Sequence, residues 1–302
     1  MRKEWIDQLQ NEFGGALRRN IPMRDYTSFH IGGAADAVLF AQSEEQLVRA
    51  VRLCREAGER YLVVGNGSNL LVSDRGVRDL VIMIRDAFSQ VSFSDETMAL
   101  GAGVRLTAAA QAAAGQSLSG LEFAYGIPGL VGGALAMNAG AYGGEMAQIV
   151  QSVRILEPDG EIREFSNELM EFGYRKSALK NGRIALSATL LLHRGEEEAI
   201  RARMAQYKSA RQEKQPLNFP SAGSVFKRPE GHFAGALIEN AGLKGVSVGG
   251  AQVSQKHAGF IVNTGNATCQ DVLELIKLIQ KRVLEQSGVQ LETELRPVGD
   301  FE

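Results

Sequence analysis

The sequence is poor in the residues that mark a disulfide scaffold, a membrane protein or a disordered chain. Its 302 residues include only two cysteines and seven prolines, and these two cysteines form neither a metal motif nor a redox motif. No apolar run approaches the roughly 20 residues that a membrane helix requires, and the charged start, residues 1–7, is unlike a signal peptide. We therefore expect no metal, no membrane segment, and a reducing, cytoplasmic setting.

The chain also lacks an excess of charge of one sign. It has 33 Lys and Arg against 35 Asp and Glu, a net charge of −2, so no basic field favours nucleic acid as a partner. With 44% hydrophobic residues and 34 glycines, the composition is typical of a compact protein with helices and sheets. We expect small-molecule partners and no obligate protein partner.

Local patterns indicate a sheet with helical cover at the start of the chain. Ser43 and Gln46 form a capping-box pattern that opens a helix, and Gly58 ends it. Residues 61–64 then read as a buried strand that runs into a glycine-rich segment. Residues 70–72 and 77–84 supply further strand-like runs, and this strand–helix–strand opening favours a sheet covered by helices.

The middle and the end of the chain carry further local signals. Pro158-Asp159-Gly160 predicts a hairpin that joins strands over 150–156 and 161–165. A helix is expected over 268–286, begun by Thr268 and stopped by Gly288. The alternation of residues 289–296 predicts a final strand.

The first glycine-rich segment is suited to an anion. It follows the predicted strand directly, and its glycines allow successive backbone N–H groups to point at one spot. The sequence is not a Rossmann fingerprint and not a Walker loop; taken alone, such a segment is more often a tight turn than a phosphate site. The segment is Gly65-Asn66-Gly67-Ser68-Asn69-Leu70.

The second glycine-rich segment extends from Tyr125 to Gly144. Its small residues allow a flat ligand to approach the backbone, although close helix–strand packing with turns would also explain them. Two such segments in one chain favour a dinucleotide cofactor over either structural reading.

Three further residues could form a reactive group if the fold gathers them. Ser224 follows Gly223, Arg175 lies within Gly173–Ser177, and Glu294 lies near the end of the chain. Each also has an ordinary reading: a turn serine, a surface arginine, and a solvated strand face that Glu294 would share with Arg296. His257 has no metal spacing around it and is read as a core histidine, and His30 has no assigned role.

These segments resemble the UDP-N-acetylenolpyruvoylglucosamine reductase family. The resemblance covers nearly the whole chain in order, through residues 27–36, 65–71, 126–143, 173–177, 223–227, 257–263 and 291–299. It implies an α+β fold: a two-lobed FAD-binding domain of the vanillyl-alcohol-oxidase type over 1–87 and 88–206, and a substrate domain over 207–302. It also implies non-covalent FAD, NADPH as co-substrate, and reduction of an enolpyruvyl ether to UDP-N-acetylmuramate in peptidoglycan precursor synthesis.

The resemblance also implies roles for individual residues. Ser224 would donate a proton, and Arg175 and Glu294 would stabilise the intermediate. Tyr174, Lys227 and Arg296 are candidate substrate contacts. The chain resembles the shorter subtype, without an inserted tyrosine loop, which leaves the uridine diphosphate contacts open. FAD would be bound by Gly65, Asn66, Gly67, Ser68, Asn69, Leu70, Gly126, Ile127, Pro128, Gly129, Gly132, Gly133, Ala134, Asn138, Ala139, Gly140 and Ala141.

Two other readings compete with this one. A sugar or alcohol oxidase on the same scaffold would need an active-site base and often a histidine linked covalently to flavin, and neither glycine-rich segment holds one. A flavin-free nucleotide-binding or regulatory protein is the alternative from another class.

Overall fold

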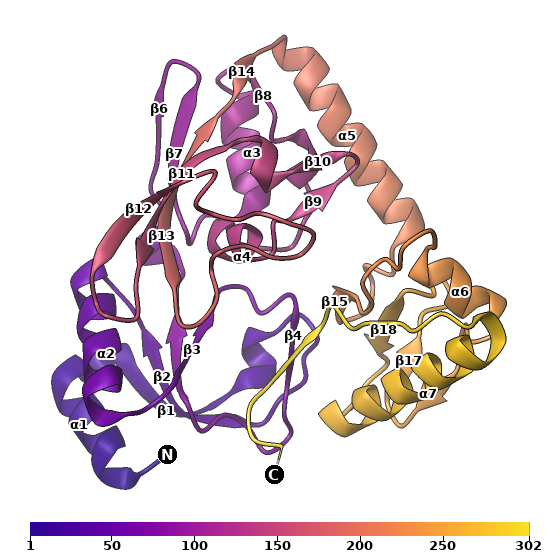
Figure 1. Cartoon of the computed structure of the whole chain (residues 1–302), viewed down its shortest axis with the longest axis horizontal. Helices are drawn as coiled ribbons and strands as arrows, with labels where there is room; N and C mark the ends of the chain where they lie inside the picture. Colours follow the sequence, from indigo (N-terminus) through magenta and orange to yellow (C-terminus); the bar gives the residue numbers. More distant parts are fainter. Residues whose placement is uncertain (302) are drawn as a thin grey trace. The chain divides into compact units, whose positions relative to one another are not determined.

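The computed structural model describes residues 1–301, which form two compact units, each assembled from segments far apart in sequence (Figure 1). The first unit contains residues 1–18, 37–66 and 79–211, and the second contains 19–36, 67–78 and the residues from 212 on. The predicted division at 87/88 and 206/207 stays a prediction.

One sheet of the fold contains two parallel strand pairs. Its order is β1 (Leu17–Pro22), β2 (Ala34–Phe40), β5 (Leu80–Met83) and β3 (Tyr61–Val64), with β5 paired in parallel to both β2 and β3. The helix α2 (Glu44–Ala57) connects β2 to β3; Ser43 accepts a hydrogen bond from the Gln46 N–H at its start, and Gly58 ends it at φ 65°. The predicted helix and both of its ends are confirmed.

A second sheet, in the first unit, is antiparallel and has the order β12-β11-β13-β7-β6. The predicted hairpin is confirmed, because β11 and β12 pair antiparallel with Leu156 opposite Ile162. The elements lying wholly or partly in the first unit are α1 (Lys3–Phe13), β1 (Leu17–Pro22), β2 (Ala34–Phe40), α2 (Glu44–Ala57), β3 (Tyr61–Val64), β5 (Leu80–Met83), β6 (Val91–Ser94), β7 (Thr97–Gly101), α3 (Leu106–Ala114), β8 (Leu118–Ser119), α4 (Val131–Ala136), β9 (Gly140–Ala141), β10 (Gly144–Glu145), β11 (Val150–Leu156), β12 (Ile162–Ser166), β13 (Ile184–Leu191), β14 (His193–Arg194) and α5 (Glu197–Lys214).

The second unit is built on a four-stranded antiparallel sheet of order β15-β18-β17-β16, which α7 contacts through β16 and β17. Thr268 and Asp271 form a capping box at the start of α7, and Gly288 ends the helix at φ 71°, which confirms the predicted helix. The elements of this unit are β4 (Leu70–Val72), β15 (Ser221–Ser224), α6 (Ala234–Asn240), β16 (Ser247–Val248), β17 (Ala251–Val253), β18 (Phe260–Asn263), α7 (Cys269–Ser287) and β19 (Arg296–Val298).

The predicted final strand over 289–296 is wrong as a continuous ladder. The alternation is real, since Leu291 and Leu295 are buried and Glu292 is exposed. However, the segment makes only a bridge between Thr293 and Phe226 before the short strand β19 pairs in parallel with β4. Side-chain alternation reports an extended backbone, and a ladder also needs a partner strand of matching length.

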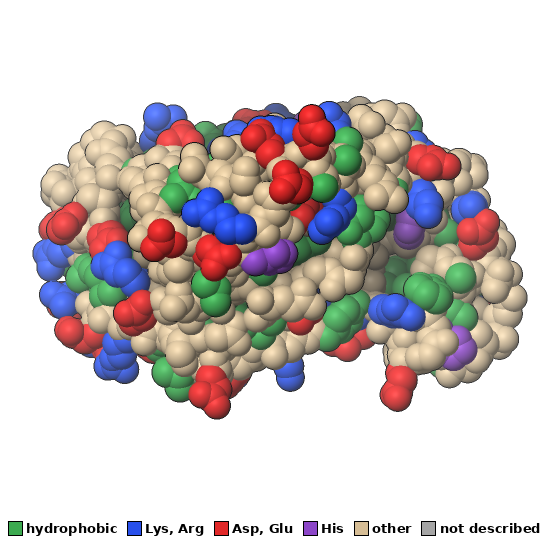
Figure 2. All heavy atoms as spheres, turned by 90° about the horizontal axis from the view of Figure 1, so that it is seen from above, with side chains coloured by type: hydrophobic (Ala, Val, Ile, Leu, Met, Phe, Trp, Pro, Cys, Tyr) green, Lys and Arg blue, Asp and Glu red, His purple; other side chains and the backbone are tan. Residues whose placement is uncertain are grey.

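The surface carries both signs of charge. Figure 2 shows Lys and Arg interspersed with Asp and Glu on the face in view, in line with the net charge of −2. Within residues 1–301, none of the helices combines the length and the apolar character needed to span a bilayer.

Asp74 generates a test of this fold, because its carboxylate caps α7 from a segment far away in sequence. Its two oxygens accept hydrogen bonds from the backbone N–H groups of Cys269 (2.8 Å) and Gln270 (3.1 Å). We expect Asp74→Ala to lower the free energy of unfolding by about 1–2 kcal/mol, since two helix-terminal donors lose their acceptor. Urea unfolding measures the change. The exposed Glu230 provides the control Glu230→Ala, and equal stability of the two variants would contradict the capping role.

Candidate active site

Within the first unit, the start of the first glycine-rich segment, residues 65–66, lies against the second glycine-rich segment. The Asn66 side chain donates a hydrogen bond from Nδ2 to the Pro128 carbonyl at 2.9 Å. A methyl group added at Gly65 would lie 3.3 Å from Leu130 Cδ1. These segments are about 60 residues apart in sequence, and the structure brings them together as a dinucleotide site requires.

The first segment retains donors suited to a phosphate. Among residues 1–301, the backbone N–H groups of Asn66, Gly67 and Ser68 have no acceptor. Gly67 has φ 62°, and a side chain there would collide with the Tyr26 carbonyl, so only glycine fits this turn. Three adjacent N–H groups without an acceptor fit an anionic group such as the diphosphate of FAD.

The second segment combines packing glycines and open ones. A methyl group at Gly132 would lie 3.2 Å from Ala102 Cβ, so this glycine allows close helix–strand contact. At Gly133 the same group would meet no described atom within 4 Å. Both readings of this segment therefore apply, each to different glycines.

Ser224 and Glu294 are brought together in the second unit. Ser224 ends β15, where it pairs with Phe260, and its Oγ donates to the Phe226 carbonyl at 3.3 Å. The carbonyl of the next residue, Val225, accepts the Glu294 N–H at 2.8 Å. Two candidate catalytic residues 70 positions apart in sequence thus lie on directly hydrogen-bonded backbone segments.

Asn69, in the first glycine-rich segment, is hydrogen-bonded to the backbone around Glu294. Its Nδ2 donates to the Glu294 carbonyl at 3.1 Å, and its own carbonyl accepts the Arg296 N–H at 3.0 Å. The parallel pairing of β19 with β4 begins there, with Arg296 opposite Leu70. Glu294 is therefore held beside the end of the segment predicted to bind phosphate.

Arg175 lies in the first unit, on the tip of a tight turn. The backbones of Gly173 and Lys176 bond to each other in both directions, at 3.1 and 3.2 Å. Arg175 occupies the third position of this turn with φ 56°, a conformation that normally favours glycine. An arginine there costs roughly 1–2 kcal/mol of backbone strain. Its predicted meeting with Ser224 and Glu294 stays a prediction.

The three candidate substrate residues differ in how they are engaged. Tyr174 is 54% exposed, and its ring centroid lies 5.4 Å from the Arg175 guanidinium carbon. Lys227 forms an ion pair with Glu292, and Arg296 is exposed in β19. Lys227 would have to exchange Glu292 for a ligand, whereas Tyr174 and Arg296 present their side chains to solvent.

His257 is a residue of this region that the sequence left without a role. Its Nδ1 accepts the Gly259 N–H at 3.1 Å, and its ring meets Phe260 edge to face with centroids 5.0 Å apart. A methyl group at Gly259 would lie 3.0 Å from His257 Cε1 and 3.5 Å from Ser224 Oγ, so both groups face the same point. The signal available in the sequence was its place at the start of residues 257–263, one of the segments that carry the family resemblance. His30 is exposed, with φ 55°.

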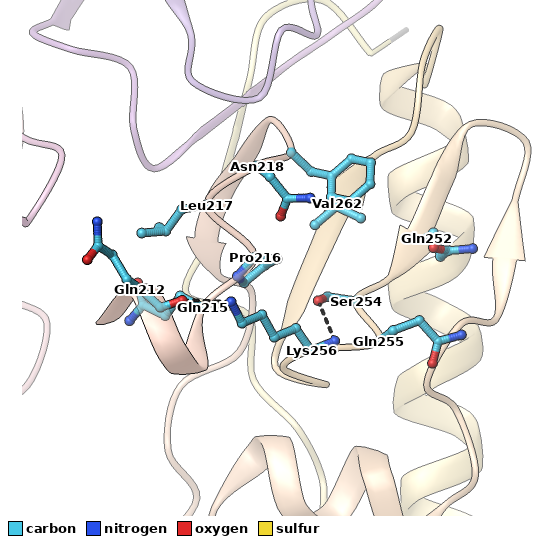
Figure 3. Close-up of a pocket in the computed structure, with 11 residues that line it drawn as sticks. Gln212, Gln215, Pro216, Leu217, Asn218, Gln252, Ser254, Gln255, Lys256 and Val262 are labelled. Atoms are coloured by element: carbon cyan, nitrogen blue, oxygen red, sulfur yellow. Dashed lines mark hydrogen bonds between the residues drawn. The ribbon is translucent and has the colours of Figure 1, made fainter. Parts of the chain in front are cut away.

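A cavity of about 720 Å³ opens in the second unit beside the β15–β18 ladder (Figure 3). Neither Ser224 nor Glu294 lines it, although Val262 in its wall pairs with Ser221 of β15. Lys256 lies in the cavity and donates from Nζ to the Gln212 carbonyl at 2.6 Å. Amide side chains dominate the lining, which consists of Gln212, Gln215, Pro216, Leu217, Asn218, Phe219, Gln252, Ser254, Gln255, Lys256 and Val262.

Comparison with known proteins identifies both parts of the chain. Residues 35–166 match the family model "FAD binding domain", and residues 215–298 match "UDP-N-acetylenolpyruvoylglucosamine reductase, C-terminal domain". The UDP-N-acetylenolpyruvoylglucosamine reductase of Alkaliphilus oremlandii is 51% identical over 280 residues, covering 92% of each chain. That of Clostridioides difficile is 50% identical with the same coverage.

Solved structures show the same similarity in three dimensions. The UDP-N-acetylenolpyruvylglucosamine reductase of Thermus caldophilus superposes with a TM-score of 0.81 at 40% identity, over 93% of this chain and 98% of its own. An alkyldihydroxyacetonephosphate synthase superposes with a TM-score of 0.50 at 18% identity, over 64% of this chain and 44% of its own. The second likeness shows a shared fold and no more. The two family matches and the reductase structure confirm the predicted order, an FAD-binding domain followed by the C-terminal domain of the reductase family, and a mixed fold of helices and sheets.

The strained turn predicts different unfolding free energies for two variants that both lack the guanidinium. Arg175→Gly should be more stable than Arg175→Ala by roughly 0.5–1 kcal/mol, because glycine adopts the left-handed conformation without a Cβ penalty. Chemical denaturation of both proteins measures the difference. A variant pair in which alanine is the more stable member would show that the turn carries no such strain.

Burial of His257 predicts a dependence of stability on pH. Burial lowers the pKa of its imidazole below the ordinary value near 6.5, so the unfolded chain binds the proton more readily than the folded protein. This contribution to stability is therefore present above the unfolded pKa and is lost as the pH falls through it. Between pH 7.5 and 5.5, His257→Gln should lose less unfolding free energy than the parent protein does. Parallel pH profiles of the two proteins would contradict this origin.

Proposed function

Because the chain belongs to the UDP-N-acetylenolpyruvoylglucosamine reductase family, we propose that it reduces the enolpyruvyl ether of UDP-N-acetylglucosamine-enolpyruvate to UDP-N-acetylmuramate, with NADPH as the reductant, in peptidoglycan precursor synthesis. The observation that carries the proposal is the hydrogen-bonded junction of the Ser224 and Glu294 segments at the end of the first glycine-rich segment. The chemistry assigned to this site needs that junction.

The residues that would hold FAD are those that the two glycine-rich segments present. Asn66, Gly67 and Ser68 offer backbone N–H groups for the diphosphate, and the open backbone near Gly133 leaves room for a planar group. The other contacts predicted between Gly65 and Ala141 belong to the same proposal, except Asn138, whose side-chain amide bonds the backbone groups of Gly173 and Ala147 instead. When bound there, FAD would supply the hydride-transfer chemistry that links NADPH to the substrate.

The residues of the chain handle the charge and the proton of this reduction. Hydride addition to the terminal carbon pushes negative charge into the neighbouring carboxylate. Arg175 carries a permanent, planar charge suited to stabilising that group. Glu294, whose N–H bonds the carbonyl of Val225 next to Ser224, would act as a protonated donor or as an orienting group.

Ser224 is proposed to donate the proton to the carbon that bears the carboxylate. Its present hydrogen bond to the Phe226 carbonyl is long, at 3.3 Å, and a hydroxyl can rotate from such a bond toward a substrate. A general acid contributes typically 10²- to 10⁴-fold to a rate.

The sugar nucleotide is proposed to use the cavity of the second unit. The glutamine and asparagine side chains in its lining can donate and accept toward a base or a sugar, and Lys256 and Phe219 add a cation and an aromatic face (Figure 3). Tyr174, Lys227 and Arg296 remain further candidate contacts. We also propose that NADPH and the sugar nucleotide take turns at one site in a ping-pong cycle, and the cytoplasmic location stays a prediction.

Replacing the Ser224 hydroxyl separates the two halves of this cycle. In Ser224→Ala, reduction of the bound flavin by NADPH should proceed at the parental rate. Its reoxidation by the enolpyruvyl substrate should slow by about 10²- to 10⁴-fold, because the proton donor is missing. Anaerobic stopped-flow absorbance follows each half-reaction.

Ser221→Ala is the matched control, since Ser221 lies on the same strand and its hydrogen bonds with Ser28 use the Ser221 backbone. It should leave both half-reactions near the parental rates. Equal losses in both half-reactions of Ser224→Ala would overturn the assigned role, and a colourless protein that takes up no FAD would overturn the function.

A further inference from the structure

We propose that Asn138 is a positioning residue that holds the Arg175 turn. The inference rests on the proposed function, in which Arg175 stabilises developing charge. Asn138 lies just after α4 in the second glycine-rich segment, and only 2% of it is exposed. The sequence placed it among the FAD contacts, and the structure shows what its amide engages.

Both ends of the Asn138 amide bind backbone groups. Its Nδ2 donates to the Gly173 carbonyl at 3.3 Å, and its Oδ1 accepts the Ala147 N–H at 2.9 Å. The Gly173 carbonyl is also the acceptor that closes the turn, through the Lys176 N–H. The Asn138 side chain therefore bonds the base of the turn that displays Arg175.

A second bond from the same stretch fixes the other side of the turn. The Ser177 Oγ donates to the Ala136 carbonyl at 3.2 Å, and Ser177 is buried. Residues 136–138 thus hydrogen-bond the chain at Gly173 and at Ser177, which lie two positions before and two positions after Arg175.

The turn needs such support because Arg175 holds a left-handed backbone that an arginine adopts at a cost. Without the bond to Gly173, the segment can relax toward an ordinary conformation, which would move the guanidinium. Asn138 is itself left-handed, with φ 40°, a conformation that asparagine tolerates better than most residues. Local geometry and side-chain reach together favour asparagine at this position.

Two substitutions test the proposal without straining the Asn138 backbone. Asn138→Gly removes the whole amide, and Asn138→Asp keeps the acceptor for Ala147 while losing the Nδ2 donor. Both should retain FAD and should be reduced by NADPH at the parental rate. Reoxidation by the enolpyruvyl substrate should slow by about 10- to 100-fold, the loss that a displacement near 1 Å causes.

A double-mutant cycle shows whether Asn138 acts through Arg175. Arg175→Ala should slow reoxidation strongly by itself, and adding Asn138→Gly should slow it no further, because the positioned group is already absent. Asn167→Ala is the matched control. Its Nδ2 bonds the Ala147 and Val150 carbonyls and, within residues 1–301, forms no hydrogen bond to residues 173–177, so the reoxidation rate should stay near that of the parent.

The pH profile of Asn138→Asp supplies a second readout. A carboxyl buried there has a raised pKa, and its protonated form can donate to the Gly173 carbonyl. The ratio of its reoxidation rate to the parental rate should therefore rise as the pH falls from 8 to 5.5. A ratio that stays constant or falls would count against the missing donor as the cause.

Three results overturn the proposal. Loss of FAD from Asn138→Gly, with Asn167→Ala unaffected, would make Asn138 a cofactor contact. A further slowing by Asn138→Gly in the Arg175→Ala background would give it a role independent of Arg175. Parental reoxidation by Arg175→Ala would refute the proposed role of Arg175 itself. The single Asn138 variants alone could not separate that failure from a failure of the positioning role of Asn138.

Discussion

The candidate site depends on the backbone hydrogen bonds of the extended segment 291–298. This segment bonds to Val225 and Lys227 on one side and to Asn69 and β4 on the other. Backbone bonds fix position more tightly than side-chain contacts do, because both partners have little conformational freedom. The Glu294 segment, the Ser224 strand and the end of the first glycine-rich segment are consequently held together as one assembly.

The elements predicted correctly from sequence are those whose cause is local. The helix α2 begins at Ser43 and ends at Gly58, and the hairpin turns at Pro158-Asp159-Gly160; a few neighbouring residues determine each feature. The final strand was wrong as a ladder because its pairing depends on residues 69–72 and 225–227. Alternation in one segment contains no information about the length of its partner.

The candidate site was predictable in its parts and much less in its assembly. The sequence indicated Ser224, Glu294 and the glycine-rich segments as candidates. It contained no local pattern that predicts the hydrogen bonds between Asn66 and Pro128 or between Glu294 and Val225. The same holds for the second unit, which combines residues 19–36 and 67–78 with residues from 212 on. The hydrogen-bond partners of buried side chains such as the Asn138 amide could not be predicted either, because a sequence does not reveal which groups a buried amide binds.

The order of these segments has a consequence for synthesis on the ribosome. Residues 19–36 and 67–78 emerge early, and their partners in the second unit follow more than 130 residues later. Until then, buried side chains such as Phe29 and Leu71 lack the apolar neighbours that will cover them. A nascent chain therefore exposes two apolar segments without their packing partners for seconds, because translation proceeds at about 5–20 residues per second. The exposure of these stretches during elongation favours chaperone binding to the nascent chain.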